Sequence, residues 1–222
     1  MEATEPVEAL RIADQRMYAN KHAGRMSAGR QSKDVLLRAL AERDPHLGTH
    51  AETVALAAAT AEALGLPPEE VESVRHASEL HDVGKVAIPD AILGKPGPLT
   101  AEEWEFVRRH TVIGERIILA APALSRVAKL VRASHERWDG GGYPDALAGD
   151  AIPVGARIVA VADAFAAMIA GRPYRPERTA QEALEELQRG AGTQFDPAVV
   201  DAWCAAHSSR IMSQRPDPLE AA

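Results

Sequence analysis

The stretch VGARIVAVADAFAAMIA, residues 154–170, predicts the fold of this chain. Its apolar side chains cover almost every face of a helix, and a helix that is hydrophobic all round is buried in a core. Asp163 lies within this helix, and an unpaired buried carboxylate costs several kcal/mol. Asp163 should therefore face a metal ion, a dense set of hydrogen-bond donors, or a buried ion pair with Arg157 or an arginine of residues 172–178.

The segments on either side of this helix are also predicted to be helical. Helical spacing and the pairs Thr100/Glu103 and Thr179/Glu182, which match capping boxes, mark most of the helix starts. We expect helices at about 7–23, 32–43, 49–64, from Pro67-Pro68 to His81, at 100–118 with a bend, and at 123–136, 154–170, from Thr179, and 197–207. No alternating strand of useful length occurs, so we predict an all-α protein in which about seven to eight of these helices form the bundle.

Composition narrows the class of protein. The chain has 222 residues, of which 46% are hydrophobic and 26% charged, enough for one folded domain. Its net charge of −7 argues against a nucleic acid polymer as partner. The most apolar run carries Pro153, Arg157 and Asp163 and makes a poor membrane span. The single cysteine, Cys204, cannot form an internal disulfide, and the amino-terminal residues lack a secretory pattern, so we expect a cytoplasmic protein.

Side chains that bind divalent metals occur on five of the predicted helices, most of them near a helix end. Taken singly, each histidine is more often a surface or core residue than a ligand. Taken together, they form the pattern of a metal site between helices, bridged by one carboxylate. The set comprises His50, the pair His81-Asp82, His110, His135 and Asp163.

Several longer motifs resemble one family. They are HDVGKVAIPDAILGKPGPLT (81–100), EEWEFVRRHTVIGERI (102–117), HERWDGGGYP (135–144), ARIVAVADAF (156–165) and RPYR (172–175). In this order and at this spacing they resemble the HD-GYP domain, the branch of the HD superfamily that hydrolyses the bacterial second messenger cyclic di-GMP. The resemblance covers about residues 32–205. It implies an HD-type helical bundle with a metal site between its helices.

The resemblance implies a set of metal ligands. These are His50, His81, Asp82, His110, His135 and Asp163. Asp82 would bridge two divalent ions, for which the family implies iron or manganese, and would be catalytic through them. His46 is a candidate ligand for a third ion, and its alternative role is that of a solvated loop histidine.

The resemblance also implies substrate contacts. Lys85 would contact the scissile phosphate as a catalytic and substrate-binding residue, and Arg172 and Arg175 would hold the other phosphate. Tyr143 lies in the GYP loop, which shapes the surroundings of the site and contacts protein partners, including GGDEF-type proteins. The implied reaction gives linear pGpG, with GMP as a candidate second product. A related cyclic dinucleotide such as cyclic GMP-AMP is an alternative substrate.

Three positions depart from the family pattern. Ser134 stands where a histidine usually precedes His135, Thr53 where an arginine is usual, and Ala166 where an aspartate is usual. A hydroxyl is a poorer ligand than imidazole for first-row divalent ions. The alternative function is therefore a catalytically weak or silent module that binds metal, nucleotide or a protein partner. A nucleotidase acting on mononucleotides is a third hypothesis.

The amino-terminal segment ALRIADQRMYANKHAGR, residues 9–25, resembles the last helix of a GGDEF domain. The alternative is a plain amphipathic helix, and no Gly-Gly-Asp/Glu-Glu-Phe loop precedes it. We expect this helix to pack on the bundle or to support a homodimer. The expected organisation is a GGDEF-like helix and linker at 1–28, an HD-GYP domain at 29–208 and a flexible tail at 209–222.

Overall fold

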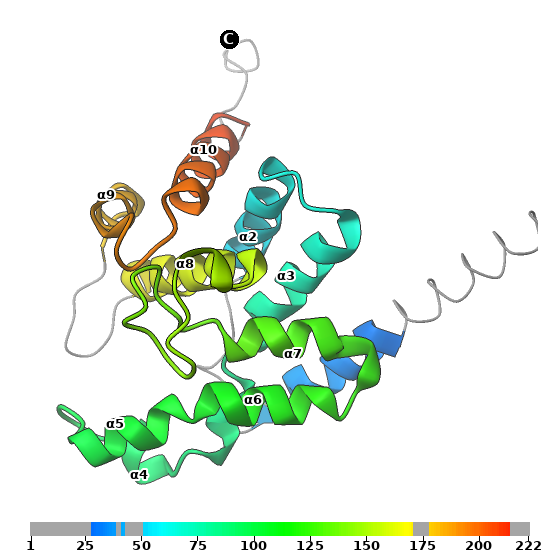
Figure 1. The fold of residues 1–222 in the computed structure, drawn as a ribbon, viewed down its shortest axis with the longest axis vertical. Helices are drawn as coiled ribbons and strands as arrows, with labels where there is room; N and C mark the ends of the chain where they lie inside the picture. Colours follow the sequence, from blue (N-terminus) through cyan, green and yellow to red (C-terminus); the bar gives the residue numbers. More distant parts are fainter. Residues whose placement is uncertain (1–27, 39–40, 43–50, 171–177, 214–222) are drawn as a thin grey trace, which may run out of the picture.

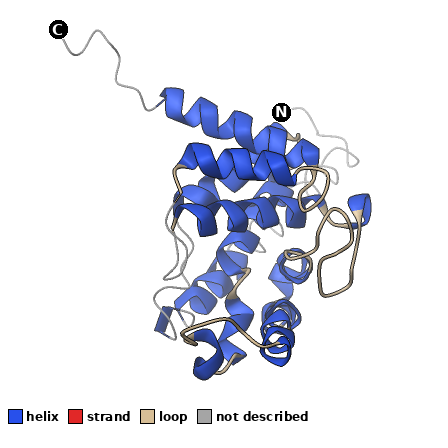
Figure 2. Cartoon of the chain, turned by 90° about the vertical axis from the view of Figure 1, so that its left-hand side faces the viewer, coloured by secondary structure: helices blue, strands red, loops and turns tan. Residues whose placement is uncertain are grey.

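The computed structural model describes residues 28–38, 41–42, 51–170 and 178–213, with side chains described as far as residue 208. These parts of the chain are helical, and the predicted all-α class is confirmed (Figures 1 and 2). Within the same ranges the β-type pairing consists of a single bridge between Ala191 and Phe195. The GGDEF-like segment lies outside the described residues except for residue 28.

The predicted helices that fall within the described residues are present, and the structure adds a short helix over Asp90–Leu93 and three 3-10 turns that the sequence did not predict. A helix over residues 28–38 precedes α2. The later elements are α2 (Ala51–Ala63), α3 (Pro68–Leu80), the 3-10 turn η2 (Val83–Ala87), α4 (Asp90–Leu93), α5 (Ala101–Arg108), α6 (His110–Leu119), η3 (Pro122–Leu124), α7 (Ser125–Arg132), η4 (Gly149–Ala151), α8 (Val154–Ile169), α9 (Ala180–Gly190) and α10 (Pro197–Ser213). Both predicted capping boxes are present, at Thr100/Glu103 and Thr179/Glu182.

Helix α8 is the centre of the bundle. It contacts α2, α3, α7, α9 and α10, and Figure 1 shows it crossing the middle of the molecule. Ile158 and Phe165 belong to a core cluster shared with α2, α3, α9 and α10, whereas Val159 belongs to a second cluster with α3, α6 and α7. The prediction that residues 154–170 form a buried helix with apolar side chains on most faces is confirmed.

Some boundaries differ from the sequence prediction. The expected bend near His110 is confirmed, because α5 ends at Arg108 and α6 begins at His110. The predicted helix at 123–136 is too long: α7 ends at Arg132. The chain then turns, and the amides of Ser134 and Glu136 donate hydrogen bonds to the carbonyl oxygens of the residues three positions before them. Helix α10 continues to Ser213, beyond the predicted end near His207.

Within the described ranges, no helix combines the length and the apolar character needed to cross a membrane.

Candidate metal centre and adjoining cavity

Ends of helices bring most of the candidate ligands together. His81 caps the carboxyl end of α3, and Asp82 caps the start of η2. His110 is the first residue of α6, and His135 lies in the turn after α7. Asp163 is the exception, because it lies within the central helix α8. Polar side chains at these positions can meet in the interior without interrupting the apolar faces of the helices.

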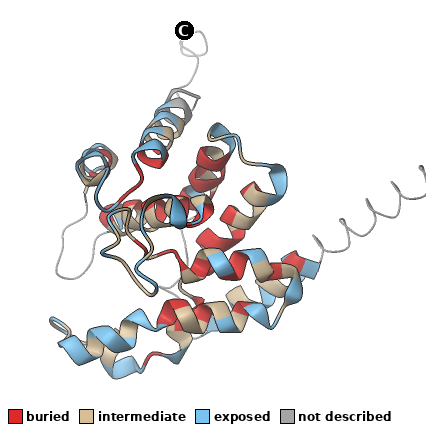
Figure 3. Cartoon of the chain, viewed as in Figure 1, coloured by how far each residue is buried: buried red, intermediate tan, exposed pale blue. Residues whose placement is uncertain are grey.

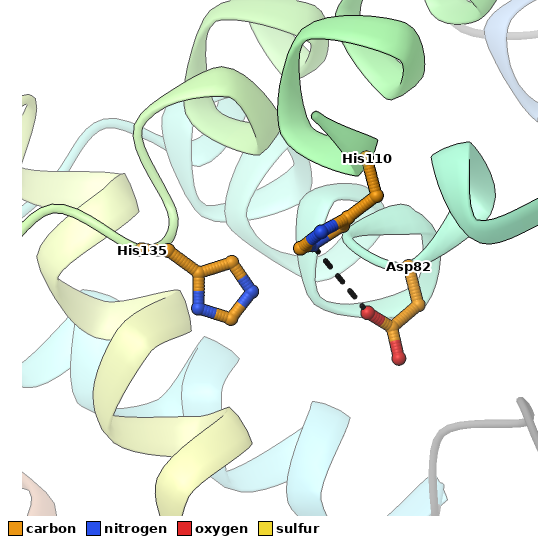
Figure 4. Close-up of side chains that lie close together, drawn as sticks. All are labelled: Asp82, His110 and His135. Carbon is orange, nitrogen blue, oxygen red and sulfur yellow. Dashed lines mark ion pairs between the residues drawn. The ribbon is translucent and has the colours of Figure 1, made fainter. Parts of the chain in front are cut away.

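Three of these side chains form a compact group. Asp82, His110 and His135 each offer one ligand atom, and the three atoms lie within 4.8 Å of one another. Figure 4 shows that the three side chains come from separate parts of the chain. His110 Nε2 lies 3.9 Å from Asp82 Oδ1. Carboxylate oxygen together with imidazole nitrogen is a donor set that suits first-row divalent ions.

Buried atoms of this group lack hydrogen bonds. Asp82 Oδ1, His110 Nε2 and His135 Nε2 are buried and find no hydrogen-bond partner among the described residues. Leaving a buried polar atom unsatisfied costs about 1–3 kcal/mol. Three such atoms converging on one point are explained if they share a cation. The residues present therefore fit a metal ion.

The backbone orients two of the imidazole rings. His81 Nδ1 lies 2.9 Å from the carbonyl oxygen of Ser78, and His110 Nδ1 lies 2.7 Å from that of Val107. A carbonyl can only accept, so each Nδ1 carries the proton and donates it. In the neutral ring of His110, Nε2 then keeps its lone pair on the side of Asp82. Such an outer hydrogen bond fixes ring orientation in metal-binding histidines.

Among the described residues, Asp163 is paired with a histidine, and the candidate partners Arg172 and Arg175 lie outside that part of the chain. Asp163 Oδ1 lies 3.4 Å from His81 Nε2. Arg157 is occupied elsewhere, with its guanidinium 2.9 Å from Asp196 and 3.1 Å from Asp150. The hypothesis of an Asp163–Arg157 ion pair is wrong, because Arg157 points toward the start of α10 and stacks over the ring of Trp138.

Lys85 lies at the same site. It is one turn beyond Asp82 on η2, and its Nζ is 2.6 Å from Asp82 Oδ2. Asp82 therefore uses one oxygen for Lys85 and keeps the other directed at His110. A lysine in this position brings a positive charge to the edge of the candidate metal centre.

Charges inside the site shift several pKa values. Burial alone would lower the pKa of His81, but the nearby charges of Asp82 and Asp163 outweigh it and raise the pKa to about 9. Burial would raise the pKa of Asp163, but the hydrogen bond and charge of His81 lower it far below its usual range. For His135 burial prevails and lowers the pKa to about 4. His135 is thus neutral at pH 7, the form in which an imidazole binds a metal ion, whereas His81 would have to release a proton on binding one.

A cavity of about 460 Å³ adjoins this group. His135, Tyr143 and Asp163 form the wall toward the candidate metal centre. The remaining lining residues include Arg108, Ser134, Arg137, Met168 and Phe195. A cavity of this size beside polar and basic groups is typical of a small-molecule site.

The loop after His135 holds Tyr143 against the site. The Tyr143 amide donates to the His135 carbonyl at 3.1 Å. Its ring stacks on the His135 ring with centroids 5.1 Å apart and an interplanar angle of 12°. Gly142 allows this fold, because a Cβ there would lie 2.4 Å from the backbone nitrogen of Arg137.

Glu136 is a residue that the sequence reasoning missed. Its buried carboxylate accepts hydrogen bonds from the amides of Asp145 at 2.7 Å and Leu147 at 3.1 Å. It therefore fastens the far side of the loop that carries Tyr143. A charged residue beside a glycine-rich segment is ordinarily solvated, so the local sequence does not predict that Glu136 is buried and binds the loop.

We expect Glu136→Gln to loosen the loop and to destabilise the fold by about 1–2 kcal/mol, because an amide offers one acceptor oxygen where the carboxylate offers two. Urea unfolding of the variant measures the loss. Glu62→Gln, on an exposed position of α2, is the control and should leave the midpoint unchanged. A Glu136→Gln midpoint equal to that of the wild type would contradict this role.

Ser134 is buried, and its hydroxyl donates to the carbonyl of Val131 at 2.9 Å. It lines the cavity beside His135, with its proton committed to the end of α7. Four other residues of the predicted site lie outside the described residues: His46, His50, Arg172 and Arg175.

A helical bundle that carries a His-Asp pair at the end of one helix and further histidines beside two others defines the class of HD-type metal-dependent domains. The model of the HD domain family matches residues 34–199. The chain belongs to the HD domain family.

Curated relatives agree with this assignment. The chain is 44% identical over 176 residues to the cyclic di-GMP phosphodiesterase response regulator RpfG of Xanthomonas campestris pv. campestris, covering 78% of this chain and 47% of the relative. It is 43% identical to 3'3'-cGAMP-specific phosphodiesterase 2 of Vibrio cholerae, covering 75% of this chain and 32% of the relative. A cyclic di-GMP phosphodiesterase of Thermotoga maritima is 42% identical, with 76% and 47% covered. The predicted resemblance of residues 32–205 to the HD-GYP domain is confirmed, whereas the GGDEF-like resemblance of residues 9–25 stays a prediction. The chain spans less than half the length of each of these relatives.

Solved structures show the same fold. An HDG"Y"P protein from Bdellovibrio bacteriovorus matches with a TM-score of 0.59 at 17% identity, covering 83% of this chain and 62% of that one. The HD domain of the phosphodiesterase PgpH from L. monocytogenes, in complex with cyclic-di-AMP, matches with a TM-score of 0.56 at 18% identity, covering 82% and 99%.

Proposed function

We propose that this chain is a metal-dependent phosphodiesterase that hydrolyses cyclic di-GMP to linear pGpG, with GMP as a further product. One observation carries the proposal: Asp82 Oδ1, His110 Nε2 and His135 Nε2 converge, buried and without hydrogen bonds among the described residues, beside a cavity of about 460 Å³. The names of the relatives from Xanthomonas and Thermotoga support this substrate, and the Vibrio relative supports cyclic GMP-AMP as the alternative.

The proposed metal ligands are the acidic and imidazole groups of the site together with the histidines that lie outside the described residues. They are His50, His81, Asp82, His110, His135 and Asp163, with His46 as the candidate for a third ion. Two ions, iron or manganese, suit this mixed set of donors. When bound, such ions would activate a water molecule as the nucleophile and would offset negative charge on the phosphoryl oxygens.

The chain's own groups position the substrate. A phosphoryl oxygen beside Lys85 Nζ would accept a charge-assisted hydrogen bond of the kind that Asp82 accepts at 2.6 Å. Tyr143 would limit the cavity on the side of His135. We assign the second phosphate to Arg172 and Arg175, on the motif alone.

A second candidate function is a catalytically silent module that binds metal, nucleotide or a partner. Ser134 favours it, because the hydroxyl that replaces the usual histidine is engaged with Val131. A protein partner at the GYP loop, a homodimer and a cytoplasmic location stay predictions from the sequence.

The experiment that separates the two functions combines metal analysis with turnover of cyclic di-GMP under reducing conditions. We expect two or more ions per chain and release of pGpG. One ion or none, with no product after reconstitution, would support the silent module. Recovery of turnover in Ser134→His would then identify the missing imidazole as the cause. Mononucleotides assayed in parallel test the nucleotidase hypothesis.

A further inference from the structure

Helix α5 carries an aromatic side chain that the core does not explain. None of the residues 101–108, all of them described, is buried, and Figure 3 shows the helix on the outside of the bundle. Helix α5 nevertheless carries Trp104, a large aromatic residue that is 48% exposed. Trp104 lies in a hollow of about 400 Å³ that is lined also by Ala101, Glu105, Arg108 and Tyr143. A tryptophan in a concave surface is typical of a binding site.

This hollow adjoins the cavity beside the candidate metal centre. Arg108 and Tyr143 line both spaces. The Arg108 guanidinium lies over the Tyr143 ring, 5.5 Å from its centroid, and the same ring stacks on His135. A ligand bound in the cavity beside the candidate metal centre would therefore contact the same two residues, Arg108 and Tyr143, that border the hollow around Trp104.

We propose that this hollow binds one guanine base of the substrate, stacked on Trp104, and so contributes to the choice of cyclic dinucleotide. The inference rests on the proposed function. The two bases of a cyclic dinucleotide are attached at opposite ends of its sugar-phosphate ring, so a molecule with one phosphate at the metal centre can extend a base into a neighbouring hollow. Aromatic side chains hold bases in this way in many nucleic-acid-binding sites.

The polar residues of the hollow suit guanine. Glu105 follows Trp104 on α5, its side chain is 67% exposed, and its Oε1 lies 3.1 Å from Arg108 Nη1. Guanine presents two donors side by side, N1–H and the exocyclic amino group, and a carboxylate can accept from both. Adenine presents an acceptor at N1 and would be repelled there. Arg108 adds positive charge near the phosphates.

The first test is equilibrium binding of cyclic di-GMP to the full chain after chelation of metal, which prevents turnover. Trp104→Ala should weaken binding about tenfold, in line with the loss of one stacked base, and Trp104→Phe should recover most of it. The matched control is Phe106→Ala, because Phe106 is also exposed on α5 but does not line the hollow. Equal affinities for Trp104→Ala and wild type, or no binding by either, would overturn the proposal.

The second test is base preference. Wild-type chain should bind cyclic di-GMP more tightly than cyclic di-AMP, and Glu105→Gln should reduce that ratio severalfold while Phe106→Ala leaves it unchanged. An unaltered ratio in Glu105→Gln would exclude Glu105 from base recognition. These tests measure binding alone. A chain that binds through Trp104 but yields no pGpG with metal restored would contradict the proposed phosphodiesterase and leave the base site standing.

Discussion

If the proposed metal centre forms, Asp82→Asn is expected to lower the metal content of the chain and to reduce cyclic di-GMP turnover by at least about a hundredfold, which is the upper end of the loss for outer partners of metal ligands. Asp82 lies close to three other groups of the site. One of its oxygens lies 3.9 Å from His110 Nε2, and the other lies 2.6 Å from Lys85 Nζ and 3.7 Å from His81 Nε2. An amide keeps the shape but removes the negative charge that these groups face.

The measurement is metal content per chain together with product release, for protein purified and reconstituted in one way. Asp201→Asn, exposed on α10, is the matched control and should retain both. Circular dichroism melting shows whether the Asp82→Asn fold is intact. A folded variant with wild-type metal content and turnover would exclude Asp82 from the metal centre.

Gly84→Ala is expected to destabilise the fold by at least about 3 kcal/mol, at the upper end for overpacking of an interior. A Cβ at this position would lie 1.9 Å from the carbonyl oxygen of His110 and 2.7 Å from the amide nitrogen of Gly114. Both neighbours are backbone, so no side-chain rotation can relieve the clash. η2 would have to move away from α6, and Asp82 would move away from His110.

Urea unfolding measures the free energy of unfolding. Metal content per chain shows whether Asp82 and His110 are still close enough to bind an ion together. Gly29→Ala is the matched control, since its Cβ would lie at an ordinary 3.6 Å from Leu124. Alanine is the better helix former, so this control should be neutral or slightly more stable than the wild type. A Gly84→Ala variant with the wild-type unfolding midpoint would show that η2 and α6 are not packed as described.

Much of the fold was predictable because its signals are local. The capping boxes at Thr100 and Thr179 consist of residues within one helical turn of each other. The apolar side chains of residues 154–170 predict a buried helix whatever packs against it. The error at the end of α7 has the same origin. Residues 133–136 have helical spacing, but the chain turns there, and Glu136 binds amides nine and eleven residues away. No local pattern contains that contact.

The sequence by itself determined the all-α class, the HD family and the list of residues able to bind metal, because periodicity, capping and motif order are properties of the chain in one dimension. Only the tertiary structure decided which of these residues meet. In the folded chain Asp163 is paired with His81, and Arg157 is paired with Asp196. Buried atoms of Asp82, His110 and His135 lie close together without hydrogen-bond partners among the described residues. The physical reason is that burial and ligand geometry arise between helices that are distant in sequence, where the cost of an unpaired polar atom depends on what packs against it.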